Sequence, residues 1–284
     1  KHKEAYEMNG KARSAIGKTA TYVTLVIIIL VLNLPFLSML GTALKPSKEA
    51  MTVELFPSNP TFENFVNIFT NTNFPRYLLN SFIVAIVAMV LCTVFAATAG
   101  YVIARKSTFF FRSYGVTLLL LQMFPTILLL LPLFLIFKSL GLVNTIYALI
   151  ITYTAMNLPF SIWLVRSFFS TIPTDLEEAA RIDGCSQFKT FYKIILPLAL
   201  PGLATVAIFT FVNSWNDYLM ASLFLRSDNI YTLTVGLHSF INQHSFQWSN
   251  LMSASTVSVL PTILFLVIAQ KYLIQGLSAG ATKG

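Results

Sequence analysis

Charged side chains are scarce in this chain. Asp, Glu, Lys and Arg make up 11% of its 284 residues, whereas soluble domains average about 25%. Hydrophobic residues supply 56%, and the mean hydropathy is +0.72. This composition excludes a globular domain with a single anchor and predicts an all-α bundle of transmembrane helices. The length allows about six spans of roughly 20 to 25 residues with short loops.

The residues that catalysis and metal binding need are also few. There are two cysteines, and Cys92 and Cys185 are expected at different depths, so no disulfide is expected. His238 and His244 have no third ligand nearby, which argues against a metal site. No Gly-x-x-x-x-Gly-Lys-Ser/Thr loop is present, so the chain cannot hydrolyse ATP by itself. No catalytic Ser/His/Asp or paired-carboxylate arrangement stands out. We therefore expect neither an enzyme nor a cofactor bound by this chain.

The basic residues are distributed unevenly. With the N-terminus inside, 14 of the 19 Lys and Arg residues fall in cytoplasmic segments and 5 in external ones. Because cytoplasmic loops carry an excess of Lys and Arg, both termini are expected in the cytoplasm. The net charge of +8 then reflects basic cytoplasmic loops, and no nucleic-acid partner is expected.

Six apolar stretches are long enough to cross a bilayer. The expected spans are 20–44, 77–104, 113–137, 145–169, 198–225 and 251–273. Pro125 and Pro132 interrupt the third of them. The first span lacks a small-residue cleavage site and is interpreted as retained, not as a signal peptide.

These spans divide the chain into three parts. Residues 1–19 form a basic cytoplasmic segment, residues 20–273 the membrane domain, and residues 274–284 a cytoplasmic tail. Two long polar loops, 45–76 and 226–250, are expected outside. The protein is thus predicted to be a multi-pass component of the cytoplasmic membrane, surrounded by lipid.

One cytoplasmic loop, residues 174–197, concentrates charge between two apolar segments. Thr174 and Glu177 have capping-box spacing, which predicts a helix from about Asp175. Gly184 is expected to end it, because glycine reaches left-handed backbone angles without a Cβ clash. Aromatic residues then recur at helical spacing, which predicts one aromatic face; they are Phe188, Phe191 and Tyr192.

This loop resembles the signature loop of membrane subunits of bacterial ABC importers. That pattern is Glu-Ala-Ala, three residues, Gly, nine residues, Ile-x-Leu-Pro. All seven positions are matched at the required spacing, by Glu178, Ala179, Ala180, Gly184, Ile194, Leu196 and Pro197. The resemblance implies a coupling helix that docks into a cleft of an ATP-hydrolysing subunit. The alternative is an amphipathic helix lying on the membrane surface.

The tail resembles the C-terminus of membrane subunits of maltose-type carbohydrate importers. There, a Gln-Arg-Tyr-like start leads into the pattern Gly-Leu-x-Ala-Gly-x-x-Lys-Gly. Gly276, Gly280 and Lys283 match it, while Lys271 stands where arginine is common. The resemblance implies that the tail contacts the ATPase subunits. The alternative is a frayed terminus.

A polar stretch near the outer end of the fifth span resembles the Trp-Asn-acidic-aromatic stretch of the same subfamily. It contains Asn213, Trp215, Asn216 and Asp217. Because an acid in or near a membrane is often functional, these residues are candidates for the translocation path. The alternative is an interfacial aromatic belt with Asp217 at headgroup level.

Taken over nearly the whole chain, the resemblance implies one permease subunit of an ABC importer for an oligosaccharide or related carbohydrate, working by alternating access. The implied partners are a second homologous permease subunit, a cytoplasmic ATPase dimer that binds ATP and Mg²⁺, and an extracytoplasmic solute-binding protein. Two alternatives remain open. One is a permease for another solute, such as phosphate or an amino acid. The other is a membrane-embedded enzyme, which would need intramembrane His, Asp or Glu clusters that the sequence lacks.

Overall fold

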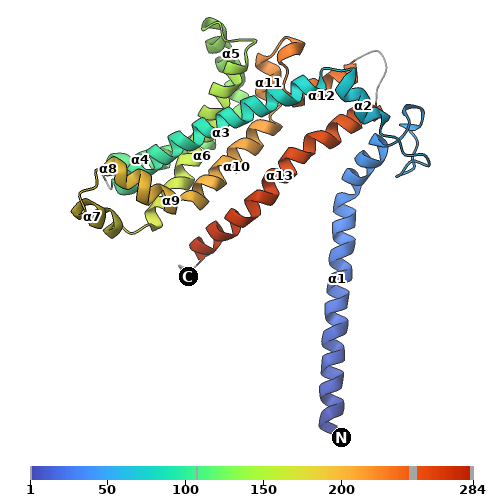
Figure 1. The fold of residues 1–284 in the computed structure, drawn as a ribbon, viewed down its shortest axis with the longest axis horizontal. Helices are drawn as coiled ribbons and strands as arrows, with labels where there is room; N and C mark the ends of the chain where they lie inside the picture. Colours follow the sequence, from blue (N-terminus) through green and yellow to red (C-terminus); the bar gives the residue numbers. More distant parts are fainter. Residues whose placement is uncertain (1, 107, 243–247, 282–284) are drawn as a thin grey trace. The chain divides into compact units, whose positions relative to one another are not determined.

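The structure, a computed structural model, describes residues 2–106, 108–242 and 248–281. Every regular element among these residues is a helix, which confirms the all-α prediction (Figure 1). The helices are α1 (His2–Ala43), η1 (Ser47–Glu49), α2 (Glu63–Thr70), α3 (Phe74–Arg105), α4 (Phe109–Gln122), η2 (Thr126–Leu129), α5 (Leu130–Ser139), α6 (Ile146–Thr171), α7 (Asp175–Ile182), α8 (Gln187–Thr190), η3 (Phe191–Ile195), α9 (Leu196–Leu198), α10 (Leu200–Asn216), α11 (Leu219–Phe224), η4 (Asp228–Ile230), α12 (Leu233–Asn242) and α13 (Trp248–Ala281).

The chain forms two compact units, residues 1–67 with 247–256 and residues 68–246 with 257–284. In the first unit, polar contacts organise the loop after α1. The Lys45 side chain is 1% exposed and donates to the backbone carbonyls of Thr52 (2.8 Å) and Glu54 (2.5 Å). The buried Asn64 amide donates to the carbonyl of Ala43 at 2.8 Å. These bonds compensate the cost of burying a charge and an amide.

The second unit is built on α3, α6 and α10, which run side by side (Figure 1). The α3 and α6 backbones approach closely at Gly100, where a Cβ atom would lie 3.2 Å from the backbone nitrogen of Arg166. A larger residue at position 100 would therefore push the two helices apart.

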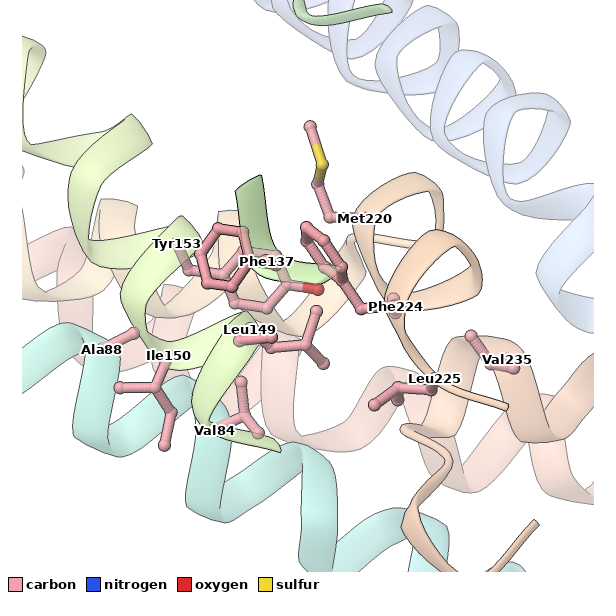
Figure 2. Close-up of a cluster of buried hydrophobic side chains, with 12 residues drawn as sticks. Val84, Ala88, Phe137, Leu149, Ile150, Tyr153, Met220, Phe224, Leu225 and Val235 are labelled. Carbon is pink, nitrogen blue, oxygen red and sulfur yellow. The ribbon is translucent and has the colours of Figure 1, made fainter. Parts of the chain in front are cut away.

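Two groups of buried apolar side chains hold the second unit together. Figure 2 shows the first core cluster, in which side chains of α3, α5, α6 and α11 converge; it includes Val84, Phe137, Leu149, Tyr153 and Phe224. The second core cluster lies where α3, α6 and α10 meet the loop 174–197; it comprises Ala96, Ala97, Tyr101, Ile103, Leu118, Ile162, Val165, Phe169, Ile195, Ala199, Leu203 and Val206.

The third expected span is broken. The stretches Ser113–Gln122 and Thr126–Ser139 meet at 90°. Pro125 lies in the break, and because proline lacks a backbone N–H and clashes with the preceding turn, it favours a kink or break at this point.

The fifth expected span, 198–225, is not one continuous helix. The helix α10 ends at Asn216, and Asp217 takes extended backbone angles (φ −70°, ψ 129°) before the separate short helix α11. The Asp217 carboxylate accepts from backbone N–H groups of α11, so the polar residue starts a new helix where hydropathy alone predicted continuity.

The span count remains compatible with the sequence. Among the described residues, four helices are long and apolar enough to cross a membrane, within Thr21–Ala43, Phe74–Arg105, Ile146–Thr171 and Trp248–Ile268. Two bent pairs, the broken third span and Gln187–Leu198 with Leu200–Asn216, bring the total to six if each pair is one span. The orientation of the termini stays a prediction.

Candidate functional site

The loop 174–197 begins with α7, which starts at Asp175 as the sequence predicted. The predicted capping box, however, is wrong. The Thr174 side chain makes no capping hydrogen bond and its backbone is helical (φ −68°, ψ −25°). The Glu177 carboxylate instead accepts from the hydroxyl of Tyr101 at 2.7 Å and from Nε of Arg105 at 2.5 Å. The bond from the guanidinium is charge-assisted on both sides, and such bonds are roughly twice as strong as those between neutral groups.

Gly184 ends α7 in the left-handed conformation, with φ +77°, which confirms the prediction. The N–H of Gly184 bonds to the carbonyl of Arg181 at 3.0 Å, and the N–H of Cys185 bonds to that of Ala180 at 2.9 Å. This pair of bonds is a Schellman motif, which satisfies the last carbonyls of the helix. No atom lies within 4 Å of a Cβ placed on Gly184, so the requirement for glycine comes from the backbone alone.

The helix α7 has two different faces. Glu177 (7% exposed) and Ala180 (4% exposed) are turned inward and buried. Glu178 and Ala179 are exposed, and Ile182 is 87% exposed. Of the Glu-Ala-Ala motif, therefore, the first two residues face outward and the third packs against the bundle.

The predicted single aromatic face after Gly184 is wrong. Phe188 is 78% exposed and Tyr192 is 62% exposed. Phe191 is half-buried, with its ring 4.7 Å from that of Tyr101 and 6.2 Å from that of Phe169. The segment η3 is a π-helical turn, and because its residues per turn differ from those of an α-helix, α-helical spacing misassigned the faces.

The second half of the motif holds the loop to the membrane helices. Ile194 and Leu196 are half-buried and pack against the second core cluster, of which Ile195 is a fully buried member. Pro197 is exposed and precedes the 75° bend into α10. The motif thus combines an outward-facing first half with an anchored second half.

A small buried polar cluster lies on the inner side of α7. Arg105, near the end of α3, forms an ion pair with Glu177, and the two side chains are only 14% and 9% exposed. Arg105 Nη1 also donates to the backbone carbonyl of Phe169 in α6 at 2.9 Å. Three elements, α3, α6 and α7, therefore meet at Arg105. We call Tyr101, Arg105 and Glu177 the anchor cluster. This cluster was not predicted from the sequence, in which the only sign of it is a rare charged residue, Arg105, at the end of an apolar span.

The polar stretch at the end of α10 does not form one cluster. Asn213 donates to Oδ1 of Asn157 at 3.0 Å, and Asn216 is exposed and bonds within its own helix. Trp215 is 3% exposed and donates to the carbonyl of Ser258 at 3.1 Å. The indole therefore packs inside the bundle, whereas the two amides lie on the surface of α10.

Asp217 has a clear local role. Its Oδ1 accepts from the hydroxyl of Tyr153 at 2.8 Å and from the backbone N–H groups of Met220 (3.0 Å) and Ala221 (3.3 Å). The carboxylate thus satisfies first-turn donors of α11, which a helix cannot satisfy internally, and ties that turn to α6.

The family of the chain follows from sequence similarity. Residues 96–279 match the family described as "Binding-protein-dependent transport system inner membrane component". The chain belongs to this family.

Similar proteins place this permease among ABC transporters. It is 34% identical to the inner membrane ABC transporter permease protein YcjP of Escherichia coli, over 96% of this chain and 99% of that protein. It is 36% identical to the trehalose/maltose transport system permease protein MalG of Thermococcus litoralis, over 88% and 91% of the two chains.

The fold of the permease recurs in a crystal structure of a bacterial ABC transporter for the import of the acidic polysaccharide alginate. The TM-score is 0.78 at 22% identity, with 91% of this chain and 96% of that chain covered. The family and these similarities confirm an ABC permease subunit, a transport component and not an enzyme, that crosses the cytoplasmic membrane several times.

The tail of the permease is continuous with its last long helix. Gly276 and Gly280 lie within α13, which runs to Ala281, and Lys283 lies outside the described residues. Contact of this tail with ATPase subunits stays a prediction.

Proposed function

We propose that the permease imports an oligosaccharide or related carbohydrate by alternating access, driven by a separate ATPase. The substrate class rests on the names of its relatives. The MalG relative is named for trehalose and maltose. A permease of Agrobacterium fabrum, 33% identical over 94% of this chain, is named for sulfoquinovosyl glycerol, and one of Halalkalibacterium halodurans, 34% identical over 88%, for arabinooligosaccharides. All three names denote sugars or sugar conjugates.

The outward face of α7 and α8 is the observation that supports coupling to an ATPase. We define the docking face as Glu178, Ile182 and Phe188. Ile182 and Phe188 are large apolar side chains at 87% and 78% exposure, on either side of the fixed turn at Gly184. Such side chains gain free energy when a partner removes them from water, and Glu178 can fix the register of docking by pairing with a basic residue.

The proposal assigns three kinds of partner. The docking face meets an ATPase subunit, which supplies ATP and Mg²⁺, and the tail with Gly276, Gly280 and Lys283 approaches the same subunits. A second permease subunit completes the pathway, and a solute-binding protein delivers substrate outside. ATP-driven closure of the ATPase dimer moves α7, and the helices respond as rigid bodies between two states.

The translocation path includes the exposed amides of α10. Asn213 and Asn216 present donors and acceptors that match sugar hydroxyls. Trp215 and Asp217 support this surface from within, the first through Ser258 in α13 and the second through α11.

Substrate uptake by cells with and without this permease tests the proposed substrate class. Deletion should abolish binding-protein-dependent uptake of one labelled carbohydrate from a panel that contains trehalose, maltose and arabino-oligosaccharides. Uptake of methionine and of phosphate should be unchanged. If methionine or phosphate uptake is lost while all carbohydrates are still imported, the proposed substrate class is wrong and the permease transports another solute.

A further inference from the structure

The anchor cluster connects the loop 174–197 to the membrane helices through charge. The Glu177 carboxylate uses both oxygens, Oε1 for Arg105 at 2.5 Å and Oε2 for Tyr101 at 2.7 Å. Glu177 lies next to the docking face in sequence but points to the inner side of α7, since it is buried while Glu178 is exposed. The two adjacent acids therefore have different surroundings.

Aromatic rings surround the anchor cluster and extend it to the second half of the loop. The Tyr101 ring lies 5.6 Å from that of Phe169 in α6 and 4.7 Å from that of Phe191 in η3. The guanidinium of Arg105 lies 5.9 Å from the centre of the Tyr101 ring. Both halves of the loop thus contact Tyr101 near the end of α3, Glu177 before Gly184 and Phe191 after it.

This arrangement limits how α7 can move. A guanidinium and a carboxylate that are only 14% and 9% exposed separate only at a large cost, because each would be left as an uncompensated charge away from water. Gly184 gives the loop a turn whose direction its Schellman bonds fix. A displacement of α7 is then transmitted to α3 through the ion pair, and to α6 through Arg105 and the carbonyl of Phe169.

We propose that Glu177 is a positioning residue for energy coupling, which makes α7 move together with α3 and α6. This inference rests on the proposed function, because it assumes that α7 receives motion from an ATPase. Glu178 and its exposed neighbours bind the ATPase subunit, whereas Glu177 transfers the resulting displacement to the spans. Retention of the ATPase and transmission of its motion are therefore separate properties of adjacent residues.

The test uses the complete transporter in liposomes, with Glu177→Gln as the main variant. Glutamine keeps the shape of the side chain and removes its charge. ATPase subunits should co-purify as with the wild type, because the docking face is unchanged. The ratio of substrate-stimulated to basal ATPase activity should fall by at least about fivefold, the low end of typical coupling between two sites. Glu63→Gln, which removes an exposed acid from α2, outside the loop 174–197, should leave both quantities unchanged.

Two further variants keep the test decisive. Arg105→Gln should reduce the ratio as Glu177→Gln does, and the double variant should add nothing, because paired residues act as a unit. Tyr101→Phe removes one hydrogen bond and keeps the ring contacts, so it should reduce the ratio less and fold normally. A wild-type ratio in all of these variants would overturn the proposal. So would loss of co-purification in Glu177→Gln, since Glu177 would then act in docking.

The failure of this proposal is distinguishable from failure of the proposed function. If Glu178→Lys and Gly184→Val uncouple the transporter while Glu177→Gln does not, the role of Glu177 is wrong and the coupling loop stands. If all three variants stay coupled with normal ATPase retention, the proposed function of the loop is wrong as well.

Discussion

At the scale of single residues, neighbouring side chains of this permease have opposite environments. Glu177 is buried in an ion pair and Glu178 is exposed. Helical geometry explains the difference, since successive residues are rotated by about 100° around the axis. Local sequence could place α7 and its end at Gly184. It could not reveal the anchor cluster, because Tyr101 and Arg105 are 76 and 72 residues away from Glu177.

Gly184 offers a residue-scale prediction with a matched control. Gly184→Val should cost about 1–2 kcal/mol of backbone strain, because a β-branched residue rarely adopts positive φ. The loop should then be misplaced and substrate-stimulated ATPase activity lost, while the protein still inserts. Gly141 has a similar φ of +69° and likewise no atom within 4 Å of a built Cβ. Gly141→Val thus imposes the same strain outside the loop and should leave stimulation near the wild-type value.

Asp217 offers a second prediction at the residue scale. Asp217→Asn retains an oxygen that can accept from Tyr153 and from the first turn of α11, so uptake should stay near that of the wild type. Asp217→Ala removes these acceptors and should cost about 1 kcal/mol at the start of α11, with lower uptake and a lower melting temperature. If Asp217→Asn abolishes uptake while Asp217→Ala is no worse, the charge itself acts in translocation and the structural role is insufficient.

At the scale of elements, the positions of some helix breaks could be predicted from the sequence, whereas their geometry could not. Proline at position 125 predicted an interruption, but the 90° angle between the two helices is not encoded in a linear pattern of residues. Hydropathy runs on through Leu225, so the end of α10 at Asn216 depended on the competing hydrogen bonds of Asp217. The aromatic residues after Gly184 were divided between two faces by a π-helical turn.

The tail provides the element-scale prediction. The proposed contact with ATPase subunits implies that deletion of residues 276–284 lowers transport while the protein still inserts into the membrane. Uptake in proteoliposomes, normalised to the amount of inserted permease, measures this effect. A truncated permease with unchanged uptake would show that the tail is dispensable.

At the scale of the whole molecule, composition gave the all-α membrane class, and the basic residues gave an orientation. The two properties are independent, because hydropathy locates spans while Lys and Arg orient them. The structure and the family confirm the class. The orientation needs a measurement from both sides of the membrane.

Accessibility labelling tests the orientation. In a background with Cys92 and Cys185 replaced by serine, a cysteine at Lys11 should react with an impermeant reagent only after the cells are opened. A cysteine at Asn59 should react in intact cells. Reaction of both positions from the same side would contradict the predicted topology.

The most direct test of the central claim, that the docking face couples this permease to a separate ATPase, is the substrate-stimulated ATPase activity of the reconstituted transporter carrying Glu178→Lys. The exposed position of Glu178 implies that membrane insertion is normal, that the ATPase subunits co-purify poorly and that the remaining activity no longer responds to substrate. Glu63→Lys, a charge reversal at an exposed acid in α2, serves as the control and should behave like the wild type. Wild-type co-purification and stimulation in Glu178→Lys would contradict the account.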